Sequence, residues 1–303
     1  MLLLFAALLL PQALSRDALQ GITEAEAFAH VKELADDSYM GREAGTEGAD
    51  KAAEYIVALL KKWGLKPGAS DGAWLQPFAG GMKNVLAVVE GSDPKLKGEF
   101  VAVGAHYDHI GMIKRRCADP INNGADDNAS GTAAVLEVAQ AFASLKDKDR
   151  PKRSVLFAWW SGEEKGLLGS RHFVKNPTVK LASVVAYLNL DMVGRGTPAT
   201  IDIEGTGCSP DLKALFEKVN AAKVFWKIKY DVVEVKPDTD HYPFWEAGVP
   251  AVEFFSGYHA DYHKPGDEAE KIDKTKLETV GRFVALSAWD LAVAAKRPGF
   301  QKK

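Results

Sequence analysis

The order of hydrophobic and polar residues along the chain predicts alternating strands and helices. Short runs that are apolar throughout are typical of strands covered on both faces. They lie at residues 84–89, 100–105, 154–160, 184–190, 199–203 and 251–255. Longer stretches between them repeat apolar residues at helical spacing, at residues 131–145, 167–174, 211–222 and 274–295. This alternation predicts an α/β sandwich with a largely parallel central sheet.

Two further helices are predicted before the first of these strands. Thr23 and Glu26 stand at the positions of a capping box, so we expect a helix from there through Leu34. A second helix is predicted to begin at Thr46 and to end at Gly64. No internal repeat and no Pro/Gly/Ser-rich linker divides the rest of the chain, which indicates one domain.

The N-terminus begins with an unbroken apolar run, residues 2–10. The run is shorter than the ~20 residues that a membrane-spanning helix needs. It fits the hydrophobic core of a signal peptide that is cut near Arg16. We therefore expect a signal peptide over residues 1–15, one domain over residues 16–303, and export to the periplasm or the extracellular space. A buried N-terminal helix is the alternative.

Composition narrows the functional classes. The chain has 303 residues, 47% hydrophobic and 26% charged, with a net charge of −3. These values exclude a disordered chain and argue against a basic nucleic-acid-binding domain. Two cysteines, Cys117 and Cys208, cannot form a disulfide scaffold or a four-cysteine zinc site, but leave one bridge open. We expect no nucleic acid, no stable membrane span and no obligate protein partner.

Histidines and carboxylates follow the predicted strands at the points where those strands end. In open α/β sheets, ligands bind beyond the carboxyl ends of the strands. A single histidine or carboxylate at a strand end is more often an ordinary loop or core residue. Several of them at the same edge of one sheet predict a ligand-binding site. A donor set without a thiolate suits zinc or a similar divalent metal in a catalytic site. The candidates are His106, Asp108, Asp126, Asp127, Glu163, Glu164, Asp191, His259, Asp261, Tyr262 and His263.

A calcium loop is the competing interpretation of one segment. Asp126, Asn128, Ser130, Gly131 and Glu137 nearly match the spacing of an EF-hand. An EF-hand needs a helix before its loop, whereas the residues before this segment favour a turn. The residues after it already have helical spacing, so we do not favour calcium.

Six short segments resemble, in order, the motifs of the co-catalytic zinc aminopeptidases, metallopeptidase family 28. They are GAHYD at 104–108, DNASG at 127–131, SGEEKG at 161–166, NLDM at 189–192, DH at 240–241 and YHKPGD at 262–267. The resemblance covers roughly residues 84–290. It implies a three-layer α/β/α sandwich with a mixed, largely parallel sheet of the zinc-peptidase/phosphorylase kind. It also implies two Zn²⁺ ions per subunit and hydrolysis of the N-terminal bond of peptides with a free N-terminus.

The same resemblance assigns the metal ligands. His106 and Asp191 are implied to hold one zinc ion, Glu164 and His263 the other, and Asp127 to bridge both. The chemistry agrees, because two close metals need a carboxylate whose two oxygens reach both.

Further roles follow from the resemblance. It implies Glu163 as general base and acid and Tyr262 as a stabiliser of the oxyanion. Asp108 and Asp267 are implied to support the ligands, and Asp240 and His241 are tentative residues of the substrate pocket. If the strand through His106 continues, the Asp108 carboxylate lies on the same face and can accept the imidazole N–H.

Several alternatives stay open at this point. A carboxypeptidase or dipeptidase of the same fold, a glutaminyl cyclase, and a binding module without activity are the competing functions. His109 and His259 are expected to be ordinary loop histidines, and residues 112–123 to form a rim over the site. Aromatic residues favour an apolar pocket for Leu- or Phe-like side chains; they are Trp226, Phe244, Trp245, Phe254, Phe255 and Tyr258.

Overall fold

The computed structural model describes residues 14–302, apart from residues 116, 198, 222–224 and 226. The predicted signal peptide therefore lies almost entirely outside the described residues, and so does Trp226. Among the helices described, none has the length and apolar character to cross a membrane.

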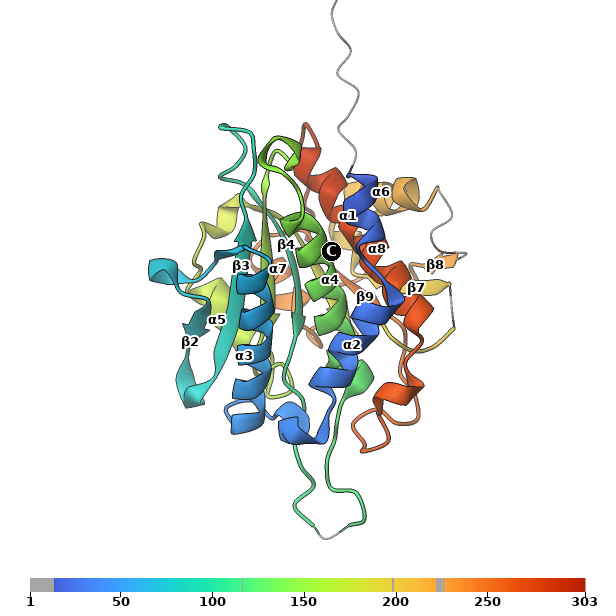
Figure 1. The fold of residues 1–303 in the computed structure, drawn as a ribbon. Coiled ribbons are helices and arrows are strands. Elements are labelled where there is room, and N and C mark those ends of the chain that lie inside the picture. The colour runs from blue at the N-terminus through green and yellow to red at the C-terminus, as the bar shows by residue number, and fades with distance from the viewer. Residues whose placement is uncertain (1–13, 116, 198, 222–224, 226, 303) are drawn as a thin grey trace, which may run out of the picture.

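The described strands, nine in number, form one mixed sheet (Figure 1). Their spatial order is β1 (Lys66–Pro67), β3 (Lys83–Val89), β5 (Ser154–Trp160), β4 (Phe100–His106), β6 (Val184–Asp191), β9 (Ala251–Phe255), β7 (Thr200–Glu204) and β8 (Lys227–Lys229), and β2 (Leu75–Pro77) pairs with β3. The central strands β5, β4, β6 and β9 are parallel. Strands β3 and β7 join this centre antiparallel, through β5 and β9. The predicted mixed, largely parallel sheet is confirmed.

Helices cover both faces of the sheet, which explains the continuous apolar runs (Figure 1). One face carries α2 (Glu24–Leu34), α3 (Glu47–Lys62), α4 (Gly131–Ala143) and α8 (Lys274–Val293), with α1 (Arg16–Gln20) and α6 (Pro210–Asn220) alongside; the other carries α5 (Leu168–Lys175) and α7 (His241–Glu246). Side chains of β5 alternate between the two cores: Phe157 and Trp159 enter the first, and Ala158 and Trp160 the second.

The start of α2 shows where a local motif gives way to a tertiary contact. The Thr23 hydroxyl accepts the N–H of Glu26 at 3.2 Å, as a capping box requires. The N–H of Thr23, however, donates to Oε2 of Glu137 on α4, at 3.1 Å, and not to Glu26.

The position of Glu137 inside a formed helix also rules out the EF-hand interpretation.

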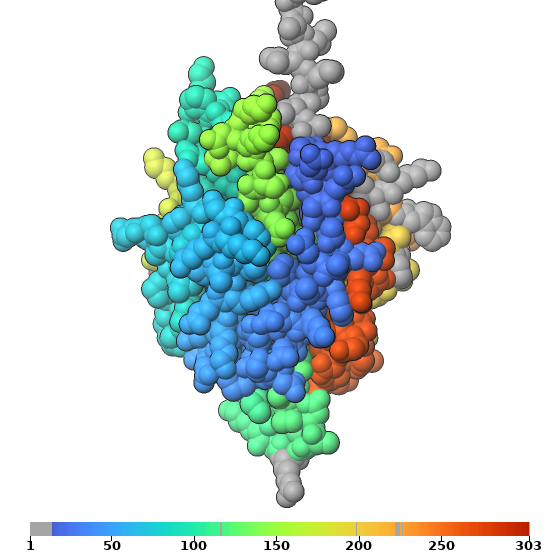
Figure 2. Space-filling model, viewed as in Figure 1, coloured from blue at the N-terminus to red at the C-terminus, as the bar shows by residue number. Residues whose placement is uncertain are grey.

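The N-terminal helices lie on the surface beside α8 (Figure 2). The Arg282 side chain donates to the carbonyl oxygens of Leu19 and Ile22, at 3.3 and 3.0 Å, and so ties the two segments together. These two hydrogen bonds join segments that are 263 and 260 residues apart in the sequence.

The segment between β4 and α4 projects from the sheet edge, at the bottom of Figures 1 and 2. Met112 and Ile121 pair across it as a β-bridge. Cys117 in this segment is exposed and Cys208 is buried beneath β9, and both thiols are free. The Cys117–Cys208 disulfide that the sequence left open is therefore not formed.

Candidate metal centre

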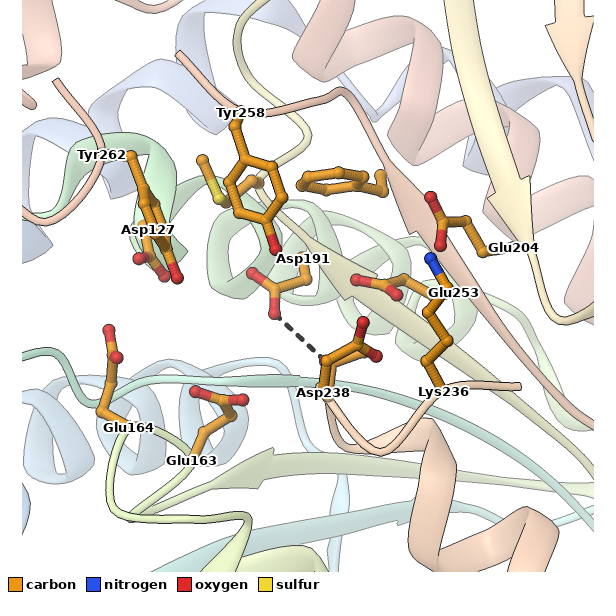
Figure 3. A pocket seen from close by; sticks show the side chains of 13 residues that line it. Asp127, Glu163, Glu164, Asp191, Glu204, Lys236, Asp238, Glu253, Tyr258 and Tyr262 are labelled. Atoms are coloured by element: carbon orange, nitrogen blue, oxygen red, sulfur yellow. Dashed lines mark hydrogen bonds between the residues drawn. The ribbon is translucent and has the colours of Figure 1, made fainter. Parts of the chain in front are cut away.

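The carboxyl ends of the four parallel strands bring the predicted ligands to one edge. His106 is the last residue of β4 and Asp191 the last of β6. Glu163 and Glu164 follow β5, and the loop after β9 carries His263. Asp127 comes from the turn before α4, so five different segments of the chain supply these residues. Figure 3 shows Asp127, Glu163, Glu164 and Asp191 around the same space.

A first set of donor atoms surrounds His106. Its Nε2 lies 3.4 Å from Oδ1 of Asp127 and 3.4 Å from Oδ1 of Asp191. Zinc bonds of ~2.0–2.1 Å in tetrahedral geometry separate neighbouring donors by about 3.3 Å. These three side chains therefore have the spacing of a zinc ligand set.

A second set uses the other oxygen of Asp127. Nε2 of His263 lies 3.1 Å from Oδ2 of Asp127 and 3.0 Å from Oε2 of Glu164. Asp127 thus presents one oxygen to each set, which is the arrangement that a bridging carboxylate requires.

His109 also belongs to this second group, contrary to the expectation that it is an ordinary loop histidine. Its Nδ1 lies 2.8 Å from Oε1 of Glu164 and 3.7 Å from Oδ2 of Asp127. Gly124, with φ +56°, allows the close approach, because a Cβ there would lie 2.5 Å from Cδ2 of His109. The position of His109, three residues after His106 at the same strand end, is the sequence signal that identifies it.

Three of the donor atoms lack the hydrogen bonds that buried polar atoms normally make. Oδ2 of Asp127, Oδ1 of Asp191 and Nε2 of His263 are buried without a hydrogen-bond partner. Buried polar atoms without partners are costly, so their convergence indicates a ligand. Imidazole and carboxylate donors with no thiolate fit zinc.

Asp108 supports this centre in a different way from the one predicted. Nδ1 of His106 lies 3.1 Å from the main-chain oxygen of Asp108, and 3.8 Å from its Oδ1. Strand β4 ends at His106, so the Asp108 carboxylate does not continue the strand face. Nδ1–H therefore donates to the main-chain carbonyl, which leaves Nε2 free for a metal. The carboxylate accepts the N–H of Glu163 at 3.2 Å instead.

Asp267 and Arg42 fix the loop that carries Asp127. Oδ2 of Asp267 accepts the main-chain N–H groups of Asp126 and Asp127, both at 3.0 Å. The buried Arg42 guanidinium donates to the carbonyl oxygens of Asn123 and Gly124, at 2.7 and 2.9 Å. No motif in the sequence marks Arg42, because its partners are main-chain atoms of distant segments.

Glu163 and Glu164 diverge although they are neighbours. Glu164 points to His109 and His263, while Oε2 of Glu163 lies 3.9 Å from Nε2 of His106. Burial raises the pKa of Glu163 well above its usual range, and the nearby Asp240 and Asp191 carboxylates raise it further. A carboxylate with raised proton affinity at this place suits a general base.

A cavity of about 150 Å³ adjoins the donor sets (Figure 3). Its lining includes Asp127, Glu163, Glu164, Asp191, Glu204, Lys236, Asp238, Glu253, Tyr258 and Tyr262. The ring of Tyr262 stacks on His263, with centroids 3.8 Å apart. Glu204, Asp238 and Glu253 belong to no motif, so sequence analysis did not identify them.

The tentative pocket residues lie behind this cavity and do not line it. Asp240 is fully buried and accepts a hydrogen bond from the Ser170 hydroxyl. His241 is buried behind Glu253. The expected apolar pocket is only partly formed, since Phe255 and Tyr258 line the cavity, whereas Phe244 and Phe254 are buried in the two cores.

The chain is similar to known peptidases over most of its length. The model of peptidase family M28 matches residues 84–288. Leupeptin-inactivating enzyme 1 of Streptomyces exfoliatus is 32% identical over 202 residues, which are 66% of this chain and 41% of that protein. A probable leucine aminopeptidase of Arthroderma benhamiae is 29% identical over 264 residues, 84% of this chain and 69% of that protein. The chain thus spans less than half of the first relative.

The fold is also that of a solved peptidase. The structure of BSAP, a zinc aminopeptidase from Bacillus subtilis, superimposes with a TM-score of 0.74 at 18% identity. The match covers 93% of this chain and 98% of that one.

Proposed function

The chain belongs to peptidase family M28, and on this basis we propose that it is a zinc-dependent aminopeptidase that hydrolyses the N-terminal peptide bond of peptides. The observation that carries the proposal is the position of Asp127. Its two carboxylate oxygens face two different donor sets, and Glu163 lies beside them in the same cavity. The names of the relatives, which include a leucine aminopeptidase, support the proposal.

Two zinc ions are proposed, one in each donor set. His106, Asp127 and Asp191 hold the first, and Asp127, Glu164 and His263 hold the second, with His109 in contact. Bound zinc supplies Lewis acidity toward the scissile carbonyl group and lowers the pKa of a water molecule to ~7.

Glu163 carries the proton transfers. Its carboxylate faces the cavity beside His106, so it takes a proton from the attacking water and delivers it to the leaving amine. The hydrogen bond from its main-chain N–H to Asp108 holds the residue in this position.

Tyr262 and the carboxylates complete the site. The Tyr262 side chain lines the cavity and is held by stacking on His263, so its hydroxyl can donate to the oxyanion. The free α-amine of the substrate lies against Glu163 and Asp191, which favours unblocked N-termini.

Export is a separate part of the proposal. The apolar run at residues 2–10 supports a signal peptide over residues 1–15 and a mature protein that starts near Arg16. The N-terminal residue of the protein recovered from the exported fraction tests this assignment.

A substrate panel tests the activity. Aminoacyl anilides, their Nα-acetylated forms and C-terminally amidated peptides are assayed with zinc and with a chelator. We expect turnover of free-amine substrates, amidated peptides included, and loss of activity with the chelator. Comparable turnover of acetylated substrates, a requirement for a free C-terminus, or cyclisation of N-terminal glutamine without hydrolysis would overturn the proposal.

A further inference from the structure

We propose that the cavity beside the metal centre is a specificity pocket for the cationic side chain of an N-terminal lysine or arginine; this rests on the proposed aminopeptidase function. Besides the donor residues, the lining of the cavity holds the carboxyl groups of Glu204, Asp238 and Glu253 (Figure 3). Lys236 is the one basic side chain in the described lining. Beyond the four acidic residues of the metal centre, three carboxyl groups and one ammonium group thus line the cavity.

Glu253 is a largely buried carboxylate that lines the cavity. It lies on β9, is 6% exposed and accepts no hydrogen bond from any described residue. The nearest basic atom is Nδ1 of His241, at 3.9 Å. Burial lowers the pKa of His241 to about 3, so this imidazole is neutral at pH 7. Burial, together with the nearby Asp191 and Glu204 carboxylates, raises the pKa of Glu253 well above its usual range. A cation bound beside Glu253 would stabilise the ionised carboxylate, and no Lys or Arg nitrogen of the described residues lies within 4 Å of it to do so.

Glu204 adds a second carboxylate directly across the sheet. Strands β7 and β9 pair antiparallel, and Glu204 is the register partner of Glu253. Like charges directly opposite each other in a sheet are destabilising. A cation bound between the two carboxylates removes this repulsion. Lys236 lines the same cavity, and its charge opposes part of this repulsion at Glu204 (Figure 3). It is exposed, however, and forms no ion pair within 4 Å with Glu204 or Glu253 in the described part of the chain.

The register also sets the distance from the metal centre. Phe255 pairs with the ligand Asp191, and Glu253 lies two residues earlier on the same face of β9. Two residues of a strand span about 7 Å. The distance along β9 from the level of Asp191 to Glu253 is therefore close to the length of an extended lysine or arginine side chain.

Apolar surface in the cavity suits the methylene part of such a side chain. Met192, Phe255 and Tyr258 contribute it to the lining. Long cationic side chains commonly lay their methylene stems along apolar surface and present the charge at the tip. A leucine side chain, in contrast, desolvates the two glutamates without giving them a partner.

Competing substrates with matched stems test the pocket. The zinc-loaded protein is assayed with the anilides of lysine, arginine, norleucine and leucine, which all have a free α-amine. A charge-assisted contact predicts kcat/KM values for lysine and arginine about ten- to hundredfold above that for norleucine. In Glu253→Gln this ratio falls about tenfold or more, and in Glu204→Gln it falls less. Glu217→Gln, on the exposed surface of α6, leaves the ratio unchanged.

Each result decides between the alternatives. A wild-type preference for leucine or norleucine over lysine overturns the specificity pocket and leaves the aminopeptidase proposal intact. An unchanged ratio of kcat/KM for lysine to that for norleucine in a folded Glu253→Gln protein has the same meaning. If that variant does not fold, competitive inhibition of the wild type by free lysine, compared with norleucine, decides. If no free-amine substrate is hydrolysed, the proposed function fails, and calorimetric binding of the two amino acids still tests the pocket.

Discussion

His109 and Glu164 are in direct contact, with 2.8 Å between Nδ1 of the imidazole and Oε1 of the carboxylate. His109 is fully buried, and its ring meets the edge of His263 at a centroid distance of 5.6 Å. The second donor set thus has four protein side chains, whereas the first, around His106, has three. Because four protein ligands close a zinc site and three leave a position open, we expect the two proposed zinc sites to be chemically unequal if His109 contributes to the second.

Replacing His109 by glutamine should weaken one zinc site selectively. Loss of a partner in direct contact with a metal ligand typically costs about 10–100-fold in affinity. We expect one tightly held zinc ion to remain after dialysis, where the wild type keeps two, as measured by elemental analysis. His172→Gln is the matched control, because His172 lies on α5, stacks on Phe78 and belongs to neither donor set. Equal zinc content in the two variants would show that His109 is only a packing residue.

Replacing Glu163 by glutamine should separate catalysis from metal binding. Glu163 faces the cavity, while Glu164 lies among the donor atoms. We expect kcat to fall by about 10²–10⁴-fold with unchanged zinc content, since proton transfer is lost and the ligands remain. Glu164→Gln, one residue along, should lose zinc as well as activity. Full activity of Glu163→Gln would refute its role as general base.

Replacing Asp267 by alanine should destabilise the loop that presents Asp127. The main-chain N–H groups of Asp126 and Asp127 both donate to Oδ2 of Asp267, and all three residues are buried. Each buried donor left without a partner costs about 1–3 kcal/mol. We expect a loss of about 2–5 kcal/mol in the free energy of unfolding, measured in urea, together with weaker zinc binding. Asp261→Ala, which removes a partly exposed ion pair with Arg195, should cost less than about 1 kcal/mol.

Glu137 should make the protein less stable as the pH rises above neutrality. Burial raises the pKa of Glu137 to about 8, from its ordinary value of 4.5. Between these values the folded protein holds one more proton than the unfolded chain, so the free energy of unfolding falls with rising pH. Burial lowers the pKa of His30 to about 4, which gives the opposite slope up to its ordinary value of 6.5. Between pH 6.5 and 8, therefore, Glu137 changes the free energy of unfolding with pH and His30 does not.

Urea unfolding at a series of pH values tests this assignment. Over pH 6.5–8, the stability of the wild type should fall about 1–2 kcal/mol more than that of Glu137→Gln. Parallel curves for the two proteins would mean that Glu137 is ionised already and paired with His30, whose Nε2 lies 3.5 Å away.

The sequence alone predicted the layers of the fold and most of the metal centre. Runs such as Ser154–Trp160 are apolar throughout because both faces of the sheet are covered, and this pattern is visible without any tertiary contact. Parallel strands place their carboxyl ends at one edge, so His106 and Asp191 could be grouped from their positions at strand ends.

The tertiary structure decided which atoms meet. The end of β4 at His106 turned the Asp108 carboxylate toward Glu163, and the loop after β4 carried His109 into the second donor set. The antiparallel register of β7 and β9 placed Glu204 opposite Glu253 and gave the cavity its charge. Local periodicity determines which residues lie on a strand and which face is apolar, whereas register and loop paths depend on contacts between segments far apart in the chain.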